Sequence, residues 1–174
     1  LKRNKFGVPE GVAVELYRYA HASEHLNVTG IDCHIGSQIS DIEPFGEAFD
    51  HLLDLSDQLA ADGIQTRHFD IGGGRGVRYD DETPIDVAAY GELIAGKLKG
   101  RNRTSVGNAG VADNDATIVI EPGRYLVADS GYLLTRVEYL KPAAGEGHRN
   151  FAVVDAAMND LIRPALYSAH HLSL

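Results

Sequence analysis

Cysteine is nearly missing from this chain, because Cys33 is the single cysteine among 174 residues. One thiol excludes an internal disulfide framework of the kind that stabilises small secreted domains. A chain without disulfides fits a reducing compartment, and we therefore expect a cytoplasmic location.

Long apolar runs and a surplus of basic residues are lacking as well. No segment approaches the length of a membrane-spanning helix, and no basic start followed by an apolar core indicates a signal peptide. The 16 Lys and Arg residues are outnumbered by 25 Asp and Glu residues, giving a formal net charge of −9. The basic residues are also scattered, so we expect neither nucleic acid nor a membrane as a partner.

What is present is an ordinary globular composition, with 44% hydrophobic and 24% charged residues. This length allows one domain with a sizeable core. The sequence starts at Leu1 and stops at Leu174 in the middle of its patterns. We therefore expect it to be a portion of a longer protein.

The most informative stretch is His68-Phe69-Asp70-Ile71-Gly72-Gly73-Gly74-Arg75-Gly76. A short apolar run that closes on an acid predicts a strand end, and the glycines after it allow positive φ angles and a close ligand. Backbone N–H groups in such a turn form a concavity for an anion, most often a phosphate. The dinucleotide fingerprint fails here, because neither Val77 nor Tyr79 supplies its last glycine. A tight turn without a ligand remains the alternative.

Helices and strands alternate along the first part of the chain. Apolar spacing and helix-end signals predict helices over residues 9–26, 40–63 and 84–99, with Ser40 or Asp41 as the cap of the second and Pro44 in its first turn. Strands are predicted over 28–35, 64–71 and 116–124. Alternation predicts an α/β fold with parallel strands, and unbroken apolar runs such as 117–120 predict burial on both sheet faces.

The pattern changes at about Ser130. Residues 132–140 and 150–155 resemble two strands joined by a Pro- and Gly-containing turn, with no helix between them. This arrangement predicts an antiparallel hairpin that opens a β domain. We expect one domain over residues 1–129 and the beginning of a second over residues 130–174.

Three predicted strands end in chemically useful groups. They are Cys33-His34-Ile35-Gly36-Ser37-Gln38, the glycine stretch, and Glu121-Pro122-Gly123-Arg124. Ligands of parallel α/β folds bind at the carboxyl ends of strands, so these groups should converge on one site. A flat ring, a hydroxyl, glycine amides, a carboxylate and an arginine are what pyridoxal 5'-phosphate requires. A metal site of His, Asp and Glu is the alternative, but no paired ligand spacing supports it.

Taken together, these motifs resemble the diaminopimelate decarboxylase branch of the alanine-racemase-like (fold type III) pyridoxal-phosphate decarboxylases. The resemblance runs from Asn4-Lys5-Phe6-Gly7 to Tyr167 and includes Met158-Asn159-Asp160-Leu161-Ile162-Arg163-Pro164-Ala165-Leu166-Tyr167, which is the motif most specific to this branch. The other motifs are shared more loosely with ornithine and arginine decarboxylases.

The resemblance implies roles for particular residues. His34 would stack on the cofactor ring and Glu121 would pair with the pyridine nitrogen, which makes these two the catalytic residues. Arg124, Arg163 and Tyr167 would bind substrate. The implied cofactor-binding residues are His34, Ser37, Gly72, Gly73, Gly74, Glu121, Gly123 and Arg124, and no metal is implied.

The resemblance also implies the latter half of a pyridoxal-phosphate-binding (β/α)8 TIM-type barrel, followed by the start of an antiparallel β domain. It implies decarboxylation of meso-2,6-diaminopimelate to L-lysine by a homodimer with shared active sites. The lysine that holds the cofactor covalently in this family matches nothing in the chain, so we expect this portion alone to be inactive. Two alternatives stay open: an ornithine- or arginine-type decarboxylase, and a non-catalytic truncated homologue that binds or regulates a partner. The loop 101–115 fits the family poorly.

Overall fold

The computed structural model describes residues 5–101, 104–105 and 115–171. Contacts divide the chain into two compact units, of which the first contains residues up to Val77 and Thr83–Leu126. The second contains Arg78–Glu82 and the residues from Val127 onward. The expected domain division at residue 129 remains a prediction.

The first unit is built on a four-stranded sheet with the order β1-β2-β4-β3. The strands are β1 (Gly30–Asp32), β2 (His68–Asp70), β3 (Thr104–Ser105) and β4 (Asp115–Val119). All three strand pairs are parallel. The predicted α/β class and the parallel pairing are therefore confirmed, although β1, β2 and β4 are each shorter than predicted and β3 was not predicted.

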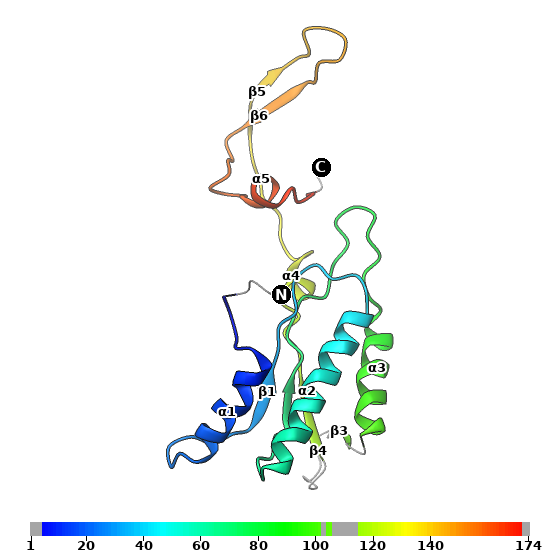
Figure 1. The fold of residues 1–174 in the computed structure, drawn as a ribbon. Helices are drawn as coiled ribbons and strands as arrows, with labels where there is room; N and C mark the ends of the chain where they lie inside the picture. Colours follow the sequence, from blue (N-terminus) through cyan, green and yellow to red (C-terminus); the bar gives the residue numbers. More distant parts are fainter. Residues whose placement is uncertain (1–4, 102–103, 106–114, 172–174) are drawn as a thin grey trace. The chain divides into compact units, whose positions relative to one another are not determined.

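Three helices accompany these strands: α1 (Glu10–His21), α2 (Glu43–Ala61) and α3 (Val87–Gly100). Figure 1 shows α2 and α3 beside the strands of the sheet. Helix α2 supplies several of the fully buried side chains. The rings of Phe49 in α2 and Phe69 in β2 meet edge to face, with centroids 6.0 Å apart. The amphipathic stripe predicted for α2 is thus the core of the unit. The largest fully buried side chains are Phe45, Phe49, Phe69, Leu53, Leu59, Ile64, Ile71 and Leu98.

The start of α2 differs from the prediction. Its N-cap is Ile42, which makes no side-chain hydrogen bond, so neither Ser40 nor Asp41 caps the helix. Pro44 does lie in the first turn, where its missing N–H costs nothing. The cap motif occurs instead at α3, where the Asp86 carboxylate accepts a hydrogen bond from the N–H of Ala89 at 2.8 Å.

Burial on both sheet faces was predicted wrongly for the described residues. In β4, Ala116 is 1% exposed and belongs to the hydrophobic core, whereas Val119 is 37% exposed. In β2, Phe69 is buried and its neighbour His68 is exposed. Successive strand residues point to opposite faces. Helices of the described chain therefore cover one face, while the other carries His68, Thr117 and Val119 at its surface.

The second unit contains the predicted antiparallel hairpin, formed by β5 (Val137–Lys141) and β6 (Phe151–Val154). Two short helices were not predicted, namely α4 (Gly123–Val127), where the two units meet in sequence, and α5 (Arg163–Tyr167). A single helical turn gives too little periodicity to be recognised in a sequence. Among the described residues, no helix is both long and apolar enough to span a membrane.

Candidate cofactor site at the strand ends

The three predicted strand ends meet in the first unit. The N–H of Cys33 donates to the carbonyl of Asp70 at 3.0 Å, and the N–H of Glu121 donates to the carbonyl of Gly72 at 2.9 Å. The N–H of Ile39 donates to the carbonyl of Gly74, also at 2.9 Å. These bonds continue the parallel ladder past the strands, so the predicted convergence of the three groups is confirmed.

The glycine run is required by close backbone packing. Gly72 and Gly74 have φ angles of 72° and 97°, which L-residues with side chains rarely adopt. Gly73 lies against the next strand end, where an added Cβ would come within 2.3 Å of the Glu121 carbonyl oxygen. The N–H of Gly72 donates to the Asp70 carboxylate at 2.8 Å. An anion cradle here would therefore depend on Gly73 and Gly74, and their role remains a prediction.

Three carboxylates gather at the same strand ends. Asp32, Asp70 and Glu121 each place a carboxylate oxygen within 4.8 Å of the others. Burial raises the pKa of Asp32, repulsion from Asp70 adds to this increase, and the nearby His34 opposes it. Such a cluster creates a negative potential that favours a cation. A metal ion or a protonated pyridine nitrogen would both satisfy this condition.

Glu121 is exposed in the described chain. The physical reason is the same as for Val119, because no described element covers this face of the sheet. His34 is exposed as well, and it lies two residues beyond Asp32 on the same face. The carboxylates and the imidazole thus lie on the same uncovered face of the described sheet.

Arg124 lies beside the first strand end. Its Nη2 donates to the Oγ of Ser37 at 2.7 Å, and its Nη1 donates to the Oε1 of Gln38 at 3.1 Å. Gly123, which begins α4, donates its N–H to the carbonyl of Glu121 at 2.8 Å. The structure therefore brings the predicted hydroxyl and guanidinium together at one end of the sheet, where a phosphate or carboxylate would find two donors.

The predicted substrate residues Arg163 and Tyr167 belong to the second unit and are described there. The guanidinium carbon of Arg163 lies 5.5 Å from the ring centroid of Tyr167 and 5.9 Å from that of Tyr79. Its Nε is buried and has no hydrogen-bond partner among the described residues. A structural ion pair with Asp155 or Asp160 would be a different role for this arginine. Instead, Asp155 binds Thr135 and Arg136, and Asp160 caps the N–H of Ala157.

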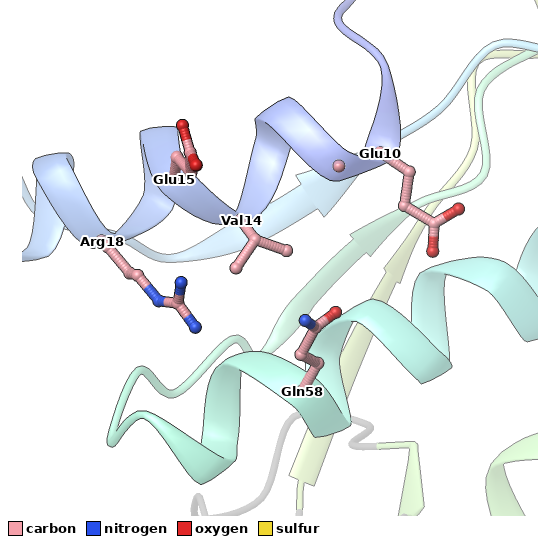
Figure 2. Close-up of a pocket in the computed structure, with 6 residues that line it drawn as sticks. Glu10, Val14, Glu15, Arg18 and Gln58 are labelled. Carbon is pink, nitrogen blue, oxygen red and sulfur yellow. The ribbon is translucent and has the colours of Figure 1, made fainter.

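A surface pocket elsewhere contains none of the predicted site residues. It lies between α1 and α2 and is lined by four polar side chains together with Gly11 and Val14, with Arg18 and Gln58 facing each other across it (Figure 2). Arg18 already forms an ion pair with Asp62 at 2.8 Å. The residues that line this pocket include neither the glycine run nor the three clustered carboxylates. The pocket is therefore separate from the strand-end site.

Sequence reasoning missed three residues of interest. Asp32 could have been found, because it lies two positions before His34 and must share its face of the strand. Tyr79 and Gln38 carried no such signal, since their contacts join segments far apart in the chain: Arg163 for the first, Val77 and Arg124 for the second. Only the folded arrangement reveals them.

Comparison with known proteins agrees with this geometry. The profile of the family described as pyridoxal-dependent decarboxylase, pyridoxal binding domain, matches residues 1–128. The diaminopimelate decarboxylase of Pseudomonas aeruginosa is 52% identical over 169 residues, which is 97% of this chain and 37% of that protein.

Solved structures show the same relationship. The crystal structure of diaminopimelate decarboxylase from Helicobacter pylori complexed with L-lysine aligns with a TM-score of 0.84 and 41% identity, covering 99% of this chain and 39% of that one. The enzyme from M. jannaschii in co-complex with L-lysine gives a TM-score of 0.84 and 35% identity, over 98% of this chain and 38% of that one.

The chain thus spans less than two fifths of the length of these relatives. The profile match covers well over half of the chain, and the aligned structures support the predicted latter part of a barrel followed by the start of a β domain. The chain belongs to the pyridoxal-dependent decarboxylases, and residues 1–128 form part of their pyridoxal-binding domain.

Proposed function

We propose that the full-length protein decarboxylates meso-2,6-diaminopimelate to L-lysine and carbon dioxide with pyridoxal 5'-phosphate as cofactor. The observation that supports this proposal is the meeting, at one end of the sheet, of a hydroxyl–guanidinium pair and a carboxylate cluster. Ser37 and Arg124 form the pair, and Asp32, Asp70 and Glu121 form the cluster. The relatives named above are diaminopimelate decarboxylases, two of them with L-lysine bound.

The residues present fit the cofactor. Its phosphate is an anion, and we place it beside Ser37, Arg124 and the amides of Gly73 and Gly74. Its pyridine nitrogen is a cation when protonated, and we place it at Glu121, where the neighbouring acids favour a positive charge. The exposed imidazole of His34 offers a flat surface for the ring. When bound, the cofactor accepts the electron pair released as the bond to the substrate carboxylate breaks.

In this proposal Glu121 is a catalytic residue, because it contacts the pyridine nitrogen of the cofactor. A carboxylate within hydrogen-bond reach keeps the proton on the pyridine nitrogen, because a charge-assisted hydrogen bond is stronger than a neutral one. Asp32 and Asp70 lie close enough to raise the negative potential around it. The proton held at that nitrogen is what makes the ring an effective electron acceptor.

Substrate choice depends on Arg163 and Tyr167 in this proposal. The far end of diaminopimelate carries a second carboxylate, which needs a fixed cationic partner when it leaves water. Arg163 forms no ion pair with Asp155 or Asp160 in the described chain, and its guanidinium packs against aromatic rings. Such an arginine keeps its donors for a carboxylate, which it binds with two parallel hydrogen bonds.

We further propose a homodimer with shared active sites, a cytoplasmic location, and a domain division at residue 129. The homodimer rests on the family resemblance. The cytoplasmic location is supported by the single cysteine, and the domain division by the change of sequence pattern near Ser130.

The test uses the full-length protein that contains this sequence. The purified protein should bind pyridoxal phosphate, as seen by its absorbance, and should release carbon dioxide from meso-diaminopimelate with L-lysine as the product. Release from L-ornithine or L-arginine instead would support a decarboxylase of the other branch. Absence of turnover with all three substrates would favour a non-catalytic homologue.

A further inference from the structure

Gln38 adopts a conformation that its residue type usually avoids. Its φ angle is 57°, which places its backbone in the left-handed region. Non-glycine residues persist there only where surrounding interactions hold them, and such residues cluster at functional sites. Gln38 directly follows Ser37, so this conformation sets the direction in which the chain leaves the first strand end.

The side-chain amide of Gln38 pairs with the loop that follows the glycine run. Its Nε2 donates to the carbonyl of Val77 at 2.6 Å, and its Oε1 accepts from the N–H of Val77 at 3.2 Å. The neighbouring Ile39 continues the pairing, because its carbonyl accepts from the N–H of Gly76 at 2.8 Å. The amide therefore adds two hydrogen bonds between two of the three strand-end loops.

The same Oε1 atom also accepts from Nη1 of Arg124, at 3.1 Å. Arg124 comes from the third strand end, so this one oxygen joins all three segments. Two donors on Oε1 and one acceptor on Nε2 fix the orientation of the amide, because the flipped amide would place its NH₂ group against both donors. Gln38 and Ser37 accept from the two Nη atoms of Arg124, so these two hydrogen bonds fix the orientation of the guanidinium.

We propose that Gln38 is a positioning residue that holds the guanidinium of Arg124 at the strand ends, where it meets an anionic group of the cofactor or the substrate. This inference rests on the proposed function and adds to it a residue that neither contacts the reacting atoms nor was given a role by its motif. The anion is the cofactor phosphate or a substrate carboxylate, since a guanidinium recognises both with the same fork of donors.

The experiment is a double-mutant cycle in the full-length enzyme. The variants are Gln38→Ala, Arg124→Lys and the double variant, with Gln58→Ala as the matched control. Gln58 is an exposed glutamine of α2 in the surface pocket of Figure 2, outside the strand-end site. Two quantities are measured for each: the dissociation constant of pyridoxal phosphate by absorbance titration, and KM with kcat for meso-diaminopimelate.

Gln38→Ala should weaken cofactor binding about tenfold if Arg124 faces the phosphate, or raise KM about tenfold if it faces a substrate carboxylate. The loss should largely disappear in the Arg124→Lys background, because residues that act through each other give non-additive effects. Gln58→Ala should change neither quantity. Losses that simply add, or no change in either quantity for Gln38→Ala, would overturn the proposal.

Gln38→Gly provides a second variant if Gln38→Ala folds poorly. Glycine adopts the left-handed backbone without strain, so this change removes the amide and leaves the chain direction intact. It should reproduce the same loss. Failure of the proposed function can be distinguished from failure of the Gln38 proposal. A wild-type enzyme that does not decarboxylate meso-diaminopimelate refutes the proposed substrate, whatever the Gln38 variants do. The role of Gln38 is then decided by cofactor affinity together with KM for the amino acid that the enzyme does decarboxylate, and no change in either quantity for Gln38→Gly would overturn it.

Discussion

The guanidinium of Arg163 lies over the ring of Tyr167, 5.5 Å from its centroid, while its buried Nε has no hydrogen-bond partner among the described residues. A cation placed over an aromatic face keeps its charge and is held in orientation. This arrangement supports the proposal that Arg163 binds a planar anion.

Replacing Arg163 with lysine tests its assignment to the distal carboxylate. A lysine keeps the charge and loses the two parallel hydrogen bonds. In the full-length enzyme, kcat/KM for meso-diaminopimelate should fall about tenfold or more, which corresponds to about 1.4 kcal/mol, mainly through KM. The exposed Arg149→Lys is the control. Unchanged KM together with a lower melting temperature and weaker cofactor binding would instead show a structural arginine.

Replacing Glu121 with glutamine tests the pyridine assignment. The amide is nearly the same shape and cannot stabilise a protonated nitrogen by charge. Cofactor absorbance should be retained, and kcat should fall by about tenfold or more, equivalent to about 1.4 kcal/mol of barrier. Glu47→Gln, an exposed change on α2, should leave kcat unaltered. Activity within about a factor of two of wild type, roughly 0.4 kcal/mol, would refute the assignment.

A buried hydroxyl pair provides a stability prediction. The Oγ of Ser56 in α2 and the Oγ1 of Thr66 lie 2.6 Å apart, and the two residues are 1% and 4% exposed. Ser56→Ala removes the hydroxyl that Thr66 contacts and should lower the unfolding free energy by about 1–3 kcal/mol. The double variant Ser56→Ala/Thr66→Val should recover part of this loss, because both polar groups are then gone. A double variant less stable than Ser56→Ala would contradict this account in a denaturant titration.

Cys33 should make stability fall at alkaline pH. Burial raises the pKa of its thiol from 9.0 to about 11, and the nearby Asp32 and Asp70 add to this increase. The folded state therefore favours the neutral thiol, and ionisation in the unfolded state begins first as the pH rises. The contribution of the neutral Cys33 thiol to the free energy of unfolding is complete below pH 9 and is lost between pH 9 and about 11. Melting temperatures over this window should fall less steeply for Cys33→Ala than for wild type, and equal slopes would contradict the prediction.

The sequence was informative where local chemistry decides the structure. The stripe of Phe45, Phe49 and Leu53 could be recognised because a helix repeats its faces regularly. The glycine run was equally clear, since few other residues tolerate its φ angles. The convergence of the strand ends followed from parallel pairing, which the alternation of elements had already indicated.

Other features depended on partners that are distant in sequence. The open face carrying Val119 could not be anticipated, because burial depends on what covers a strand rather than on its own apolar run. Ile42 rather than Asp41 precedes α2, and Ile42 packs against the hydrophobic core, a contact that local cap signals do not report. The bonds of Gln38 to Val77 and Arg124 span 39 and 86 positions, and no local pattern reports such a contact.

The central claim is decarboxylation of meso-diaminopimelate by the full-length protein, and its most direct test compares kcat/KM across substrates. With pyridoxal phosphate supplied, carbon dioxide and L-lysine should form in equal amounts from meso-diaminopimelate, with kcat/KM at least about a hundredfold above that for L-ornithine or L-arginine, about 2.7 kcal/mol. A higher kcat/KM for either of those amino acids, or no carbon dioxide from meso-diaminopimelate, would contradict the account.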